Sequence, residues 1–421
     1  MRVAPWLLPA LLPLLAACSE ANNPDSATTT IASRSSQAAA DTAAATAATA
    51  TAAFVPDSAA AVRATSRSQP AARPDTAEVH DVAAYLAGLP PSRSDSFDSL
   101  TAQLAWRAFA TDADKSWLKY AQTHTAPMTK WGVRELDSVR QVSPTIFYPF
   151  SGPDFLNVVT LFPTAKTYIL VGLEPVGSVP GPAVLRRPDL FKSVQASLWS
   201  VLNFSFFRTN DMAVDLKSAQ LDGALPLIML FAARTGHQLL AVRPVQLDAD
   251  GYLQPRDTAQ RLNPKHVPGA EIRALAADGT EKNIYYFSND ISDGNLMRHP
   301  ALLRHVRSLG PLTTYVKSAT YLMHKPYFSK VRNLILQRSQ YVLQDDSGIA
   351  MKYFPKGWRF THYGAYKRPI NLFAKHYQPE ITAAYADSVR RPRPLPFGTG
   401  YNWRQTDSNL LLARPPQRPA D

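Results

Sequence analysis

Short apolar runs alternate with segments of helical periodicity along this chain, and this alternation is the feature that most constrains its fold. Thr145–Phe150 (TIFYPF) is rich in β-forming residues, and Tyr168–Gly172 (YILVG) is a second apolar run of strand length. Between them, Pro153 suits the first position of a helix that continues to Leu161. Helices that alternate with short buried strands predict a mixed α/β domain.

Turn signals and further helical patterns complete the predicted architecture. Asp250-Gly251 and Asp278-Gly279 lie between β-forming runs and predict hairpins. The expected fold is therefore a set of strands with flanking helices, later hairpins and an N-terminal helical segment; a helical cap on a separate antiparallel sheet is the alternative. Helical periodicity is found over Ser96–Thr123, Leu190–Phe207, a segment that ends near Gly236 before a strand from Gln238, Asn295–Leu309, Thr313–His324 and Ser329–Ser339.

The first 17 residues have the layout of a secretory signal: one basic residue, Arg2, then an apolar stretch and two small residues. The stretch is too short for a spanning helix and is interrupted by prolines. The sequence Leu15-Ala16-Ala17-Cys18 resembles the lipobox of bacterial lipoproteins. The resemblance implies cleavage before Cys18, lipidation of its sulfur and, with Ser19 next, sorting to the outer membrane. An ordinary signal peptide with an incidental cysteine is the alternative.

Composition divides the rest of the chain. We expect residues 18–75, rich in alanine, threonine and serine, to be a disordered tether behind the lipid anchor, with transient helix as the alternative for its alanine-rich part. Residues 76–421 are expected to be globular, with a helical lead-in over 76–143 and the main body over 144–421; they suffice for one large domain or two ordinary ones. Cys18 is the only cysteine. An exported chain of this kind has no disulfides, so a core must stabilise it.

The basic charge is concentrated in the C-terminal third. From Arg298 onward the sequence has 20 lysines and arginines against 6 aspartates and glutamates. Basic clusters with aromatic residues between them can bind anionic glycans or lipid head groups, whereas the export signal argues against nucleic acid. A solvated basic face and aromatic packing are the alternatives. The candidate binding residues are Trp358, Tyr363, Arg390, Arg391, Arg393 and Trp403.

Two polar stretches are candidates for catalysis. In FYPFSGPDF, Ser151 and Asp154 lie between a strand and a helix start, although the glycines of a nucleophile elbow are missing and both residues can simply cap the helix. In YVLQDDSGIAMKYF, Asp345 and Asp346 can divide acid and base roles, with His362 as a proton carrier. A hairpin turn with Gly348 at its end is the alternative for these two carboxylates.

Metal and cofactor patterns are not found in the sequence. The histidines have no zinc-ligand spacing, the segments LDADGY and YYFSNDISDGN do not complete a calcium loop, and no glycine-rich phosphate loop is present. No cofactor and no metal are therefore expected.

The stretches FYPFSGPDFL, GLEPVG, YVLQDDSGI, YGAYKRPI and LPFGTGY are similar to those of a group of bacterial proteins with no established activity, so the resemblance implies no function. The sequence predicts a lipid-anchored cell-envelope protein, at the outer membrane, that binds an anionic envelope component. An envelope hydrolase that uses Ser151 or the Asp345/Asp346 pair is the alternative, and an assembly lipoprotein with an unknown protein partner is a third. Residues of a functional site must share one cavity. The structure therefore tests which of the polar candidates lie together: Ser151, Asp154, Glu174, Asp290, Asp345 and Asp346.

Overall fold

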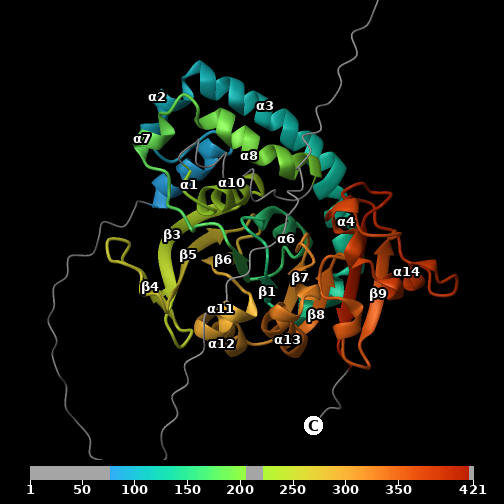
Figure 1. Cartoon of the computed structure of the whole chain (residues 1–421). Helices are drawn as coiled ribbons and strands as arrows, with labels where there is room; N and C mark the ends of the chain where they lie inside the picture. Colours follow the sequence, from blue (N-terminus) through green and yellow to red (C-terminus); the bar gives the residue numbers. More distant parts are fainter. Residues whose placement is uncertain (1–75, 205–220, 417–421) are drawn as a thin grey trace, which may run out of the picture. The chain divides into compact units, whose positions relative to one another are not determined.

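The computed structural model describes residues 76–204 and 221–416. Over these residues the chain forms one mixed sheet of ten strands with helices on both faces, in the order β4-β3-β5-β6-β2-β1-β7-β8-β10-β9 (Figure 1). The mixed α/β prediction is thereby confirmed. The strands are β1 (Thr145–Tyr148), β2 (Thr167–Gly172), β3 (Gln238–Leu247), β4 (Leu253–Pro255), β5 (Val267–Leu275), β6 (Glu281–Ser288), β7 (Leu312–Val316), β8 (Ser339–Gln344), β9 (Arg359–Gly364) and β10 (Asn409–Arg414).

The centre of the sheet is parallel. Strands β6, β2, β1, β7 and β8 pair in parallel, while β10 lies antiparallel between β8 and β9. From β1 the chain moves to one side, through β2 to β6, and then crosses to the other side of β1 for β7 and β8. This reversal on either side of the first strand defines a doubly wound sheet, in which ligands bind outside the carboxyl ends of the strands where the order reverses.

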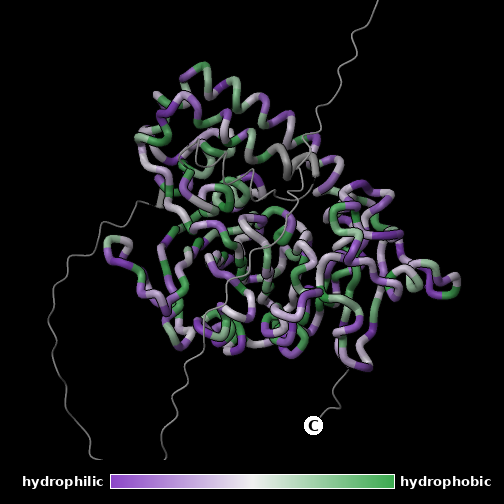
Figure 2. Tube along the Cα trace, viewed as in Figure 1, coloured by the Kyte–Doolittle hydropathy of each residue, from purple (hydrophilic) through white to green (hydrophobic). Residues whose placement is uncertain are grey.

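The alternation of side chains along each strand produces two cores. Ile146 and Tyr148 of β1 pack on one face, and Phe147 packs on the other. The first face is covered by α1 (Thr76–Leu86), α3 (Leu104–Tyr120), α4 (Ala126–Glu135), α6 (Phe155–Leu161), α8 (Leu190–Phe204) and α10 (Leu225–Arg234). The second is covered by α11 (Asp293–Arg298), α12 (Ala301–Ser308) and α13 (Ser329–Arg338). Helix α10 is apolar along almost its whole length, as Figure 2 shows, because it is buried on all sides.

The described chain also contains short α-helices, besides short 3₁₀ and π-helical segments. The short α-helices are α2 (Asp98–Thr101), α5 (Asp137–Val142), α7 (Pro182–Leu185) and α14 (Pro379–Ala386). No helix among residues 76–204 and 221–416 has the length and apolar character that a membrane crossing requires. The predicted signal peptide, lipidated Cys18 and tether lie outside the described residues.

Several predicted elements agree with the structure and others are corrected. The hairpins at Asp250-Gly251 and Asp278-Gly279 are confirmed, since β3 pairs with β4 and β5 with β6. The predicted helix over Thr313–His324 is wrong: its first part is the central strand β7, whose β-branched residues suit a strand buried on both faces. The predicted helix Asn295–Leu309 is two helices, α11 and α12, separated at Pro300.

Asp345–Gly348 forms a tight turn, in which Gly348 N donates to the Asp345 carbonyl oxygen at 3.2 Å, but the prediction that this turn closes a hairpin is wrong. Strand β8 ends at Gln344, and the strand that pairs antiparallel with it is β10 rather than the next strand in the chain. The two aspartates therefore stand at the carboxyl end of a parallel strand. Periodicity could not show this, because the partner strand lies more than 60 residues later in the sequence.

Candidate functional site

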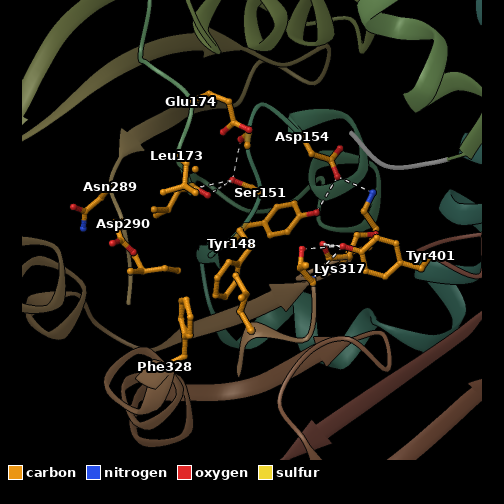
Figure 3. A pocket seen from close by; sticks show the side chains of 18 residues that line it. Tyr148, Ser151, Asp154, Leu173, Glu174, Asn289, Asp290, Lys317, Phe328 and Tyr401 are labelled. Atoms are coloured by element: carbon orange, nitrogen blue, oxygen red, sulfur yellow. Dashed lines mark hydrogen bonds and ion pairs between the residues drawn. The ribbon is translucent and has the colours of Figure 1, made fainter. Parts of the chain in front are cut away.

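A pocket of about 180 Å³ opens at the carboxyl ends of four parallel strands, where the order of the sheet reverses (Figure 3). The loops after β1, β2, β6 and β7 all contribute to its wall, and Tyr401 enters from the C-terminal part of the chain. This is the position at which doubly wound sheets bind ligands. The polar lining residues are Tyr148, Ser151, Asp154, Glu174, Asn289, Asp290, Lys317, Ser318, Thr320 and Tyr401.

Asp154 and Lys317 form a buried ion pair on one side of this pocket. Lys317 Nζ lies 2.8 Å from Asp154 Oδ2, and the two side chains are only 2% and 3% exposed. The Tyr148 hydroxyl donates to the same carboxylate oxygen at 2.9 Å. Burial raises the pKa of Tyr148 well above its usual range, and the nearby carboxylate adds to the shift, so this phenol stays protonated as a donor.

Asp154 has a second role as the N-cap of α6. Its Oδ1 accepts hydrogen bonds from the backbone N and the side-chain amide of Asn157, at 3.2 and 2.8 Å. Helix α6 therefore begins at Phe155, directly after its cap Asp154, and Pro153 precedes the cap. A carboxylate fixed at this helix N-terminus fills the place where a phosphate group would otherwise bind.

Ser151 lines the pocket but is held by the backbone. Its Oγ donates to the carbonyl oxygens of Gly152 and Val171 at 2.9 and 3.2 Å, and it accepts from Val171 N at 2.9 Å. These bonds join the loop after β1 to strand β2. Among the described residues, none of the hydrogen bonds of Ser151 reaches a histidine or a carboxylate, so the arrangement does not activate its hydroxyl as a nucleophile.

Glu174 forms the opposite side of the pocket, after β2. Its carboxylate accepts a hydrogen bond from the Tyr286 hydroxyl at 3.2 Å, and the same hydroxyl donates to its carbonyl oxygen at 2.8 Å. A Cβ added at Gly152 would lie 3.4 Å from the carboxylate, and one added at Gly172 would clash with it. Two glycines from adjacent strand ends thus leave room for this acidic group.

Two buried polar atoms in the pocket have no hydrogen-bond partner within residues 76–204 and 221–416. They are Asn289 Nδ2, after β6, and Ser318 Oγ, after β7. Both atoms are buried and have almost no surface open to the pocket, so a ligand would reach them only after a local rearrangement.

Backbone strain is concentrated around the same pocket. The non-glycine residues with positive φ in the described chain are Phe150, Ser318, Thr320 and Tyr321, with φ between 52° and 60°. The first lies in the loop after β1 and the others in the loop after β7. Such conformations are unfavourable for side-chain-bearing residues and cluster at functional sites.

Asp345 and Asp346 lie beside the pocket rather than in its wall. Asp345 Oδ2 accepts from Ser318 N at 2.8 Å, while Asp346 bonds to the Tyr321 hydroxyl and to Asn409 Nδ2, the latter at 2.9 Å. Burial raises the pKa of both carboxyls, that of Asp346 to about 7, and their mutual repulsion adds to the effect at Asp346.

The predicted binding residues and the predicted proton carrier lie outside the lining of this pocket. His362 lies on β9, separated from β8 by β10, and burial lowers its pKa. Trp358 and Tyr363 are buried in the two cores, so they pack inside the protein and are not available to bind a ligand at the surface, whereas Trp403 is half-buried. Arg393 forms an ion pair with Glu135 at 2.9 Å. Arg390 and Arg391 are exposed.

The structure brings four of the six polar candidates into one cavity: Ser151, Asp154, Glu174 and Asp290. Lys317 was missed because it follows an apolar run that has helical periodicity in the sequence, although a lysine directly after a β-branched run was a usable signal. No cluster of three or more metal-ligating side chains occurs in the part of the chain that the structure describes.

Comparisons with known proteins do not identify the chain: no family model, curated protein or solved structure matches it.

Proposed function

We propose that the pocket binds a neutral or cationic small molecule with vicinal hydroxyls, of which a nucleoside is the best fit. The observation that carries this proposal is the Glu174 carboxylate, which stands at the carboxyl end of β2 beside Gly152 of the loop after β1. In doubly wound sheets that bind nucleotides, an acidic residue following the glycine-containing turn accepts hydrogen bonds from the ribose hydroxyls.

The charges in the pocket argue against a phosphorylated ligand. Glu174, Asp290 and Asp154 contribute three carboxylates, and the lysine in the wall, Lys317, is already ion-paired with Asp154. A phosphate at the start of α6 would meet the Asp154 carboxylate at the position where nucleotide-binding folds place backbone amides. A nucleoside, a sugar or a cationic nucleoside derivative avoids this repulsion.

The remaining wall suits a planar ring. Leu173 and Ile291 provide apolar surface beside Asn289 in the pocket wall. The order of the parallel strands reverses beside β1, as in doubly wound sheets that bind nucleotides. S-adenosylmethionine, a cationic nucleoside derivative without phosphate groups, is one ligand of the proposed class.

The test compares adenosine with 2′-deoxyadenosine on the wild type and on Glu174→Gln. A hydrogen bond to a charged group contributes about 1.5–3 kcal/mol, so losing the carboxylate is expected to weaken adenosine binding roughly 10- to 100-fold. The variant should bind the two nucleosides nearly equally. Glu380→Gln, at an exposed position of α14, is the matched control. Equal adenosine affinity in wild type and Glu174→Gln would contradict the proposal, and preferential binding of N-acetylglucosamine would assign the diol to a sugar.

The cellular setting remains a proposal based on the lipobox: acylated Cys18 would hold the chain at the cell envelope. A second surface supports binding of anionic lipid head groups or glycans there. Val389 is 89% exposed and is followed by exposed Arg390 and Arg391. Asp387 Oδ1 accepts from the backbone N of Val389 and Arg390, at 2.7 and 3.0 Å, and so fixes this turn. An apolar apex beside two cations suits an anionic membrane surface.

A further inference from the structure

The loop that follows β7 has an unusual backbone. Ser318, Thr320 and Tyr321 all have φ near 52°, in the left-handed region that side-chain-bearing residues rarely adopt. The loop also carries Ser318 Oγ, one of the two unpaired buried atoms of the pocket, and it directly follows Lys317. Three such residues in four positions persist only where surrounding contacts hold them.

Three side chains from other parts of the chain bind the backbone of this loop. Asp345 Oδ2 accepts from Ser318 N at 2.8 Å, and Ser347 Oγ accepts from Ala319 N at 2.8 Å. The Tyr401 hydroxyl accepts from Thr320 N at 3.1 Å and donates to the Ser318 carbonyl oxygen at 2.8 Å. Consecutive amides of the loop are therefore satisfied by side chains instead of by regular secondary structure.

The second aspartate holds the far end of the loop. Asp346 accepts from the Tyr321 hydroxyl, and Asn409 orients it through two bonds, Nδ2 to Oδ1 at 2.9 Å and Asp346 N to Asn409 Oδ1 at 2.8 Å. A Cβ at Gly400, the residue before Tyr401, would clash with the Asp345 carboxylate. Strand β10, the Tyr401 segment and the end of β8 thus meet at this loop.

We propose that Asp345 and Tyr401 are positioning residues of the ligand site: they hold the loop of residues 318–321 in its left-handed conformation and thereby keep Ser318 and Thr320 in the pocket wall. This assigns the acidic pair a role other than acid–base catalysis. The effect on ligand affinity rests on the proposed nucleoside site, whereas the effect on the loop does not.

The first readout is amide hydrogen exchange of the full-length chain, which needs no ligand. Tyr401→Phe removes the hydroxyl that binds Thr320 N and the Ser318 carbonyl, and Asp345→Asn replaces the acceptor of Ser318 N. Both variants are expected to speed amide exchange across 318–321 by at least about tenfold. The free energy of global unfolding is expected to change less than the free energy of local opening in this loop. Tyr377→Phe, at a half-exposed tyrosine, is the matched control. Unchanged exchange in both variants would overturn the proposal.

The second readout is adenosine affinity with a rescue variant. Tyr401→Phe is expected to weaken binding at least about fivefold, and Thr320→Gly in the same chain to restore most of it, because glycine adopts positive φ without strain. Failure of the rescue while binding is weakened would overturn the positioning role. Absence of nucleoside binding in the wild type would instead overturn the proposed function, and hydrogen exchange would still decide the role of the two residues in the loop.

Discussion

The buried Asp154–Lys317 pair gives a quantitative prediction about the pocket. Lys317→Met keeps most of the side-chain volume but leaves the Asp154 carboxylate without its cation at a site that is 3% exposed. Breaking a buried pair from one side costs about 3–5 kcal/mol, because the remaining charge is uncompensated. Asp154→Asn should also destabilise the chain, because it removes the carboxylate that pairs with Lys317, although asparagine still caps α6 well.

The double variant Asp154→Asn/Lys317→Met removes both charges and should be less destabilised than the sum of the single variants by at least about 2 kcal/mol. Urea unfolding followed by tryptophan fluorescence measures the three free energies of unfolding. Additive effects of the two substitutions would contradict this prediction, since they would mean that the charges do not interact in the folded protein.

Further consequences follow from the same structure. Gly172→Ala should destabilise the chain by about 1–3 kcal/mol and weaken nucleoside binding, because the new Cβ clashes with the Glu174 carboxylate; thermal unfolding and calorimetry measure the two effects. Burial raises the pKa of Asp346 to about 7, so the folded state retains a proton that the unfolded chain releases above about pH 4. The free energy of unfolding should therefore fall as the pH rises from about 4 to 7, and Asp346→Asn should flatten this slope in urea titrations at several pH values. Replacing Arg390 and Arg391 with serine should reduce sedimentation of the chain with anionic vesicles and leave neutral vesicles unaffected; equal sedimentation with anionic vesicles would contradict the second surface.

Local pattern was enough to predict the elements that surround the first strand. The apolar run at β1, the turn after it and the helix through Leu161 are all set by neighbouring residues, so Ser151 and Asp154 could be named in advance. Strand β7 was misread because its four-residue Thr-Thr-Tyr-Val core continues into a segment with helical spacing. Burial on both faces, which is a tertiary property, determines its conformation.

The composition of the pocket could not be predicted in the same way. Tyr148, Glu174, Asn289 and Lys317 are spread over almost 170 residues and meet only because their strands are adjacent and parallel. Strand order is fixed by non-local pairing, which one sequence does not reveal. The aromatic residues of the C-terminal third show the converse problem, since hydropathy alone cannot distinguish a buried Tyr363 from one that binds a sugar.

The proposed site must accept a hydroxylated ligand and reject phosphate. Isothermal titration calorimetry of the purified chain with adenosine, S-adenosylmethionine and adenosine monophosphate tests it directly. We expect measurable binding of at least one of the first two and at least tenfold weaker binding of the monophosphate. Tighter binding of the monophosphate than of adenosine, or no binding of either adenosine or S-adenosylmethionine, would contradict the account.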